Sequence, residues 1–357
     1  MNSTLKLHRL IFNLCAMVAC ALAVSQGAQA STPHLDRISP TRVNAGAQNV
    51  TVTLSGTSFA ADDQVFINGS ATPVQSSSAS SITVAVPDAM LTNPTVLNFE
   101  IRATDNSVSS TRALVVIDPA KLNAQSSNSV LASSYRNRVS PGAIVTTFGT
   151  RLATATAFAT SLPLPTSLSG TRVFIGGAIM PLLFVGDDAN SNSFGQVNFV
   201  LPDDFTAGTT EILVLAGDGS TTLGNITIDT VSPGVFTLNQ SGGGLPVALT
   251  TTDGVGYFPV WNPDNTPVQV NAGTAQQPTY LAIFGTGWRH RTSQSNVVVT
   301  VGGASAQVLY ADLQPDFAGL DQLNLVIPPQ LAGTGGPVEI VITVDGIEAN
   351  RTTITIQ

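Results

Sequence analysis

A seven-residue phrase that occurs twice is the feature that most constrains the fold of this chain. Its copies span residues 196–202 and 322–328, and read Gln-Val-Asn-Phe-Val-Leu-Pro and Gln-Leu-Asn-Leu-Val-Ile-Pro. A Gly-Gly pair lies upstream of both, and the 22 residues from Gly176 to Asn198 recur in the second copy. Phe-Gly-Thr stands further upstream and Asp-Gly downstream in both copies. Shared order and shared spacing indicate a duplicated domain.

The first thirty residues have the pattern of a secretory signal peptide. Lys6 and Arg9 form a basic start, residues 10–24 are mostly apolar, and Ala28-Gln29-Ala30 is a small-x-small cleavage site. This pattern predicts export, with cleavage near Ala30 and a secreted or cell-surface location. We expect no membrane span, because the apolar run is shorter than the roughly 20 residues that a span needs.

The two cysteines leave one alternative open for this segment. Lipoprotein processing at Cys20 would tether the protein to a membrane by acyl chains. Cys15 and Cys20 both precede the cleavage site, so the exported chain would contain no disulfide and would fold on core burial alone. The chain is long enough for two to three domains.

Composition narrows the range of partners. Charged residues make up 10% of the chain, and the formal net charge is −8. A chain this acidic cannot neutralise phosphates, so we expect neither nucleic acid nor an anionic membrane surface as a partner. Few charges, with abundant small and β-branched residues, suit β-sheets joined by tight turns.

Residues 33–118 predict one immunoglobulin-like sandwich of about seven short strands. Segments 50–54 and 82–86 alternate apolar and polar residues, as half-buried strands do, and Asn68-Gly69 signals a hairpin. This order of features resembles the IPT/TIG family of immunoglobulin-like domains. The residues with that resemblance are Ile38-Ser39-Pro40, Gly56, Phe59, Val65 to Gly69 and Ile82 to Pro87.

The rest of the chain divides into a linker and two copies of the repeat. We expect a linker over residues 119–129, one immunoglobulin-like sandwich over 130–232, and the second copy over 233–357. The second copy contains an extra stretch, 240–277, which we interpret as a hairpin plus an extended loop. The expected fold is therefore all-β, with tandem immunoglobulin-like β-sandwich domains after a cleaved signal peptide.

Roughly residues 126–357 resemble a domain family first described at the C-termini of secreted Solibacter proteins. The residues that match include Ser140-Pro141-Gly142, Phe148-Gly149-Thr150, Leu162 to Leu168, Gln196-Val197-Asn198, Ser232 to Thr237, Phe284 to Gly287, Phe317 to Leu320 and Gln322-Leu323-Asn324. The resemblance implies architecture and export, and no chemistry. Asp321 departs from it, since an aromatic residue is expected there.

The repeated residues have a structural interpretation and a functional one. Gly176-Gly177 and Gly302-Gly303 are expected in hairpin turns that need positive φ, which glycine adopts readily. Pro202 and Pro328 follow a strand, where a missing N–H costs no ladder bond. The Gln-x-Asn pair either maintains the fold or forms a ligand site at the same place in both domains.

Few residues suit catalysis or metal binding. Apart from the signal segment the chain has two histidines, His34 and His290, and it has no Gly-x-Ser-x-Gly elbow. Two distant histidines are too few to form a zinc site, which usually has three or four protein ligands. Asp188, Asn190 and Asn192 have the alternate spacing of a calcium loop, although the turn glycine and the bidentate glutamate are missing. Asp312, Asp316 and Asp321 form a second acidic cluster. We expect no cofactor.

Aromatic residues gather in the last domain, and they are the predicted binding residues. Tyr257 and Trp261 lie in the extra stretch, and Trp288 follows the Phe-Gly-Thr-Gly turn beside His290. Flat aromatic faces on loops suit contact with a partner. The alternative is that these side chains pack the larger domain.

The sequence predicts a non-enzymatic, exported or cell-surface protein for binding, adhesion or spacing, which acts through loops on β-sandwiches. Its expected partner is a protein or a glycan. The alternative function is a polysaccharide-active enzyme or its carbohydrate-binding accessory module, which predicts paired carboxylates in a cleft.

Overall fold

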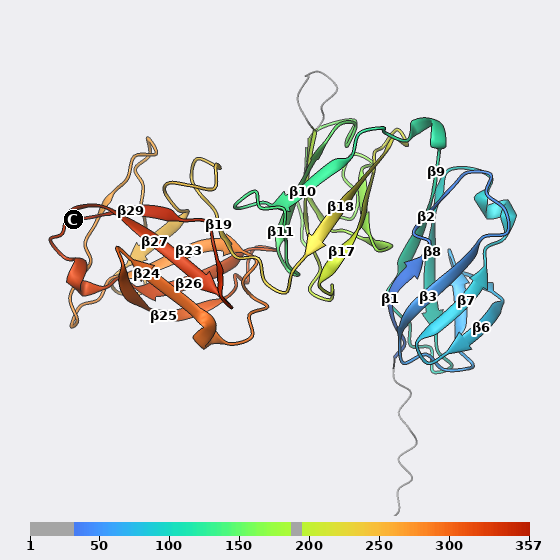
Figure 1. The fold of residues 1–357 in the computed structure, drawn as a ribbon, viewed down its shortest axis with the longest axis horizontal. Coiled ribbons are helices and arrows are strands. Elements are labelled where there is room, and N and C mark those ends of the chain that lie inside the picture. The colour runs from blue at the N-terminus through green and yellow to red at the C-terminus, as the bar shows by residue number, and fades with distance from the viewer. Residues whose placement is uncertain (1–31, 187–194) are drawn as a thin grey trace, which may run out of the picture.

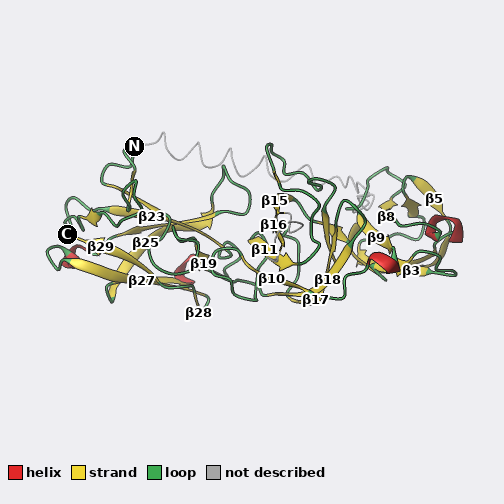
Figure 2. Ribbon diagram, turned by 90° about the horizontal axis from the view of Figure 1, so that it is seen from above, coloured by secondary structure: helices red, strands yellow, loops and turns green. Residues whose placement is uncertain are grey.

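The computed structural model describes residues 32–186 and 195–357, and the regular elements of these residues are β-strands and short 3-10 helices. Three β units follow one another along the long axis of the molecule (Figure 1). The view from above shows the same row of units (Figure 2). We name strands β1 to β9 the first unit, β10 to β18 the second and β19 to β29 the third. The expected all-β class is confirmed, whereas residues 1–31, with the expected signal segment, lie outside the described residues.

The first unit consists of two sheets. The four-stranded sheet has the order β1 (His34–Ser39), β3 (Thr51–Thr57), β7 (Ser81–Ala85) and β6 (Val74–Ser78). The five-stranded sheet has the order β2 (Arg42–Asn44), β9 (Arg112–Ile117), β8 (Thr95–Arg102), β4 (Gln64–Ile67) and β5 (Ser70–Thr72), and η1 (Asp88–Leu91) precedes β8.

The alternation of buried and outward-facing residues along the strands explains how these two sheets share a core. In β3, Val52 and Leu54 are fully buried while their neighbours face outward. The predicted hairpin at Asn68-Gly69 is present between β4 and β5, where both residues have positive φ, of 48° and 79°. Two-residue hairpin turns favour this conformation, and Asn-Gly adopts it readily.

The second unit is one continuous path of nine strands. Their order is β12 (Ala157–Phe158), β15 (Leu182–Gly186), β16 (Gly195–Val200), β11 (Ile144–Gly149), β10 (Ser127–Leu131), β18 (Thr221–Ile228), β17 (Gly208–Leu215), β13 (Arg172–Ile175) and β14 (Ala178–Ile179). Inward residues from both halves of the path pack into one cluster. The path therefore encloses its own core.

The third unit repeats this arrangement with additions. Its main order is β21 (Phe258–Pro259), β20 (Ala248–Thr251), β23 (Tyr280–Thr286), β26 (Asp321–Val326), β25 (Ala304–Leu313), β24 (Val297–Val301), β27 (Gly336–Val344), β29 (Thr352–Ile356) and β22 (Gln269–Val270). Two strands pair beside this path, β19 (Gly234–Val235) and β28 (Ile347–Glu348), and the 3-10 helices are η3 (Gln294–Asn296) and η4 (Pro329–Leu331). The expected hairpin in the extra stretch is the β20–β21 pair.

The strand registers show the duplication directly. Thr146 lies opposite Asn198 in the second unit, and Ala282 lies opposite Asn324 at the same place in the third. Both Gly-Gly turns have positive φ in their two residues, as predicted. Separate hydrophobic clusters fill the second and third units, so each copy folds around its own core.

The first and second units are joined through β9. All six residues of this strand are buried, because its two faces pack on different units. Leu114 faces the core of the first unit, while Val115 packs with Phe174 and Leu213 of the second. The N–H of Ala113 also donates to the carbonyl of Gly177 at 2.6 Å.

The segment expected as a linker, 119–129, lies against the second unit. It contains η2 (Pro119–Lys121) and the first residues of β10. Asn123 donates from its backbone N–H to the carbonyl of Thr221 and from Nδ2 to the carbonyl of Thr150, both at 2.8 Å. These bonds hold the segment in place and limit the freedom of the first joint.

We predict that Val115→Asp loosens this joint without unfolding either unit, because it places a charge in the shared apolar contact. Small-angle X-ray scattering should show a larger radius of gyration. Leu114→Ala is the matched control: it removes core volume and should lower the free energy of unfolding by about 2–5 kcal/mol with an unchanged radius of gyration. A wild-type scattering profile for Val115→Asp would contradict the role of β9 as the joint.

Candidate binding site between the second and third units

A buried ion pair lies where the third unit faces the second. Asp321 begins β26 and is 0% exposed. Its Oδ1 accepts a hydrogen bond from Arg289 Nε at 2.7 Å, and its Oδ2 accepts the backbone N–H of Trp288 at 2.9 Å. Arg289 also donates from Nη2 to the carbonyl of Leu320 at 2.9 Å. The pair thus ties the loop after β23 to the start of β26.

Burial raises the pKa of the Asp321 carboxyl, while Arg289 and the Trp288 N–H oppose this shift. A buried charge is tolerated in a protein interior when it is paired and hydrogen-bonded. Asp321 is the position where the family resemblance led us to expect an aromatic residue. The structure accounts for the carboxylate, because Arg289 is its partner.

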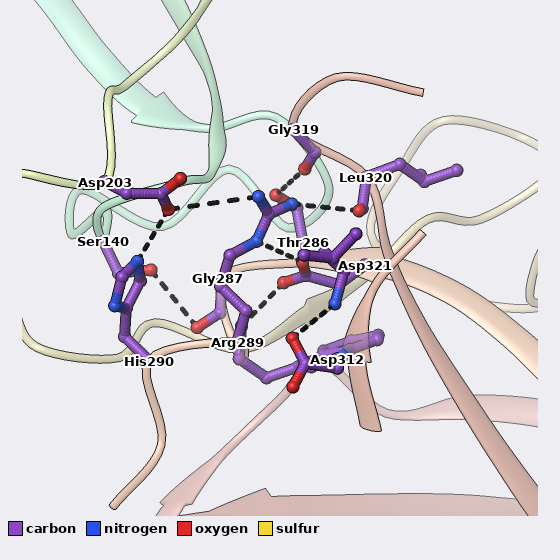
Figure 3. A network of polar contacts seen from close by, with 12 residues as sticks. Ser140, Asp203, Thr286, Gly287, Arg289, His290, Asp312, Gly319, Leu320 and Asp321 are labelled. Carbon is purple, nitrogen blue, oxygen red and sulfur yellow. Dashed lines mark hydrogen bonds and ion pairs between the residues drawn. The ribbon is translucent and has the colours of Figure 1, made fainter. Parts of the chain in front are cut away.

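The same arginine faces the second unit. Asp203 lies in the loop after β16, and its Oδ1 is 4.0 Å from Arg289 Nη1 and 2.7 Å from His290 Nε2. Figure 3 shows the Arg289 guanidinium between the carboxylates of Asp203 and Asp321, with the His290 ring beside Asp203. Gly142 passes beside this contact with φ +73°, and a Cβ there would stand 2.4 Å from Asp203 Oδ1. The site therefore requires glycine at this position.

Hydroxyl and backbone groups complete the junction. Thr286 Oγ1 accepts the N–H of Ile144 from the second unit at 3.0 Å and donates to the carbonyl of Gly319 at 2.7 Å. The carbonyl of Gly287 accepts from Ser140 Oγ at 3.2 Å and from the N–H of Ser232 at 2.9 Å. The repeated Ser-Pro-Gly segments thus meet at one residue and fix the two units together.

A groove of about 1070 Å³ lies alongside this junction. Its floor includes the outward face of β11 and β16, with Thr146, Gln196 and Asn198. Its exposed walls include Leu162 and Phe317, each 64% exposed. Further lining side chains come from the third unit, among them Phe236, Leu238, Val247 and Phe284. Both units are therefore needed to form the groove.

The groove combines apolar walls with uncharged polar groups. Gln196 Nε2 donates to Asn198 Oδ1 at 2.8 Å, so the two amides of the repeated phrase hold each other. Ser133 is 3% exposed, and its Oγ has no hydrogen-bond partner among the residues that the structure describes. Asp316 is the one charged residue among the described residues that line the groove. The lining therefore suits an uncharged, hydrogen-bonding occupant.

A smaller hollow lies on the equivalent sheet of the third unit. Its volume is about 360 Å³, and its lining includes Asn324, Tyr280 and Tyr257. Gln322 Nε2 donates to Asn324 Oδ1 at 2.9 Å, which reproduces the amide pair of the second unit. Each copy of the repeated phrase thus contributes an amide to a surface hollow.

The predicted aromatic site is not a single cluster. Trp288 is 0% exposed and packs in the core of the third unit, so it presents no face to solvent, in agreement with the packing alternative. Trp261 is half-buried against the same core. Tyr257 is 51% exposed and lines the smaller hollow, whereas His290 is exposed beside Asp203. Tyr257 is the member of the predicted set that a ligand in a hollow can reach.

Of the two acidic candidates for calcium, the cluster of Asp312, Asp316 and Asp321 lies within the described residues and is not placed to hold a metal ion. Asp188, Asn190 and Asn192 lie outside the described residues. Asp312 pairs with Arg291 at 3.1 Å and Asp321 with Arg289. Within residues 32–186 and 195–357, no group of three or more His, Cys, Asp or Glu is placed to hold a metal ion.

Sequence reasoning missed Arg289 and the apolar residues of the groove, although it left open a ligand site at the Gln-x-Asn pair, which lines the groove. The burial of Trp288 had one signal in the repeat. Trp288 stands three residues after the glycine of Phe-Gly-Thr, and the residue at the same place in the second unit, Leu152, is buried as well. The exposed Leu162, in a proline-rich loop, was a weaker signal for an apolar surface. Nothing in the local sequence marks Arg289 as the partner of Asp321, since 32 residues separate them.

Asp321→Asn should lower the free energy of unfolding by about 3–5 kcal/mol, because it leaves Arg289 without its buried partner. Chemical denaturation of the full chain measures this change. Asp312→Asn is the matched control: its pair with Arg291 is partly exposed, so the expected loss is at most about 1 kcal/mol. If the two variants lose the same free energy of unfolding, the buried pair of Asp321 stabilises the fold no more than the partly exposed pair of Asp312 does.

Among the described residues, no helix has the length and apolar content needed to cross a membrane.

Comparisons with known proteins locate one family in the chain. Residues 33–115 match the model of the IPT/TIG domain. A search of curated proteins finds no match.

Solved structures that are similar to this chain include the following three. The Bacteroides ovatus mixed-linkage glucan utilization locus protein SGBP-B, in complex with a mixed-linkage heptasaccharide, is 14% identical, with 92% of this chain and 71% of that chain covered and a TM-score of 0.27. The TIG domain of human nuclear factor of activated T-cells, cytoplasmic 4, is 18% identical over 26% of this chain and 95% of that chain, with a TM-score of 0.21. The plexin A4 extracellular region is 10% identical over 92% of this chain and 34% of that chain, with a TM-score of 0.21.

At these identities and TM-scores, the solved structures bear neither on the ligands nor on the function of this chain. The resemblance of residues 126–357 to the Solibacter-type family stays a prediction. The first unit belongs to the IPT/TIG domain family.

Proposed function

We propose that this chain is an exported, non-catalytic binding protein whose partner occupies the groove between the second and third units. The observation that supports this most is the groove itself, with a volume of about 1070 Å³ and a lining drawn from both units. Specific ligand sites are concave and mostly apolar, with a few placed polar groups. Leu162 and Phe317 form such walls, and Gln196 and Asn198 supply such groups.

Rigidity of the junction supports a binding role. The bond of Ser140 Oγ to the Gly287 carbonyl and the bond of the Ile144 N–H to Thr286 Oγ1 hold the second and third units in one orientation. A preformed groove loses less conformational freedom on binding than a flexible one. IPT/TIG and immunoglobulin-like units fit a binding or spacer role, and we assign the spacer role to the first unit, which stands at the other end of the row (Figure 1).

The alternative of a polysaccharide-active enzyme finds less support in this groove. Glycoside hydrolysis commonly uses two carboxylates about 5–10 Å apart. Of the described residues that line the groove, Asp316 alone carries a carboxylate. The related alternative, a carbohydrate-binding module, needs no such pair and remains compatible with the lining.

To test the proposal, the chain without residues 1–30 is screened against immobilised polysaccharides and a displayed peptide library. We expect saturable binding to at least one of these, weakened at least about tenfold by Leu162→Asp, because a carboxylate in the apolar wall opposes desolvation of the groove. Val298→Asp is the matched control, since Val298 is an exposed apolar residue of the third unit outside the groove. It should bind as the wild type does.

Two outcomes would count against the proposal. If neither polysaccharides nor peptides bind, the chain acts as a spacer. If both aspartate variants lose binding equally, the partner does not occupy the groove.

A further inference from the structure

We propose that the two Gln-x-Asn pairs form tandem subsites for an uncharged glycan chain. This inference rests on the proposed binding function and names the ligand class. One subsite contains Gln196 and Asn198 in the groove, and the other contains Asn324 in the smaller hollow, paired with Gln322. All four amide residues occupy half-buried outward positions of their strands, which accept many kinds of side chain.

The amide pairs present complementary groups to hydroxyls. In each copy the Gln amide donates to the Asn carbonyl oxygen, at 2.8 Å and 2.9 Å. This leaves the Gln carbonyl oxygen as an acceptor and the Asn amide as a donor of two further bonds. A sugar hydroxyl both donates and accepts, so neighbouring hydroxyls can satisfy both groups of one pair.

The position of the pairs on sheet faces disfavours a peptide strand as the occupant. Strand addition needs a free sheet edge. β16 lies between β15 and β11, and β26 lies between β23 and β25, so both strands already use their backbone groups in ladders. An occupant of these faces must bind through side chains, as a polyhydroxylated chain can.

The polar floor disfavours an apolar helix, and the sparse charge disfavours an anionic chain. An apolar face laid over Ser133 and the Gln196 pair would bury hydrogen-bonding groups without partners, at a cost for each. Asp316 and Asp253 are the only charged residues among the described linings of the two hollows. Without a cation to neutralise it, a uronate chain would be repelled.

Aromatic side chains supply surfaces for the apolar faces of sugar rings. Phe317 is 64% exposed at the groove, and Tyr257 is 51% exposed at the smaller hollow. The outward row of β23 connects the two places, since Phe284 lines the groove while Ala282 and Tyr280 line the hollow. Two equivalent subsites suit a ligand that itself repeats, which a polysaccharide does.

Affinity gel electrophoresis of the chain without residues 1–30 tests the proposal, with a β-glucan, an arabinoxylan and a galactomannan as neutral probes and polygalacturonate as the anionic probe. At least one neutral polymer should retard the protein, and polygalacturonate should not. The Gln196→Ala, Asn198→Ala variant should bind about tenfold more weakly, because it loses the hydrogen-bonding groups of one subsite.

The third-unit variant Gln322→Ala, Asn324→Ala should also weaken binding of the long polymers, because a chain that spans both subsites gains avidity. Gln307→Ala, Asn225→Ala is the matched control: these amides lie on exposed strand positions outside both hollows. Phe317→Ala changes an exposed wall, so it tests the groove even if an amide variant folds poorly.

Each negative outcome is informative. Retardation by no neutral polymer, or equal affinity in the amide and control variants, overturns the glycan assignment. Peptide binding that Leu162→Asp abolishes, without any glycan binding, leaves the proposed binding function standing and removes this inference alone. Stronger retardation by polygalacturonate than by the neutral polymers would contradict the charge argument.

Discussion

The buried ion pair of Asp321 and Arg289 fixes the loop of the third unit that contacts the second unit. A carboxylate with no exposed surface needs a partner, and Arg289 is held beside it by two oxygens, those of Asp321 and Leu320. The guanidinium of Arg289 also lies 4.0 Å from the carboxylate of Asp203, so the loop that the pair fixes contacts the second unit as well. The groove depends on the orientation of the second unit relative to the third, since its lining residues come from both units.

The two copies of the repeat differ at the positions of the buried ion pair. By the register of the repeat, Asp321 corresponds to Gly195 and Arg289 to Ala153. The second unit therefore lacks this ion pair, since it has two small, uncharged residues at these positions. The sandwich is common to both copies, whereas the buried ion pair belongs to the third unit alone.

Sequence patterns predicted the local structure well, because alternation and turn chemistry act over a few residues. The Asn68-Gly69 hairpin and the Gly-Gly turns are examples. The groove could not be predicted, since it depends on contacts such as that between Ile144 and Thr286, which are 142 residues apart. The burial of Trp288 follows from Gly285, whose missing side chain makes room: a Cβ there would stand 2.2 Å from the indole.

The repeated phrase contains residues of two kinds, and one structural cause does not explain both. Its proline and the alternating apolar residues follow from the strand and its end, as in β16 and β26. The amides have no such cause, because a half-buried outward position on a sheet accepts many side chains. Each pair satisfies only part of its hydrogen-bonding capacity internally. The remaining groups lie at hollows in both units, which favours a ligand as the reason for the amides.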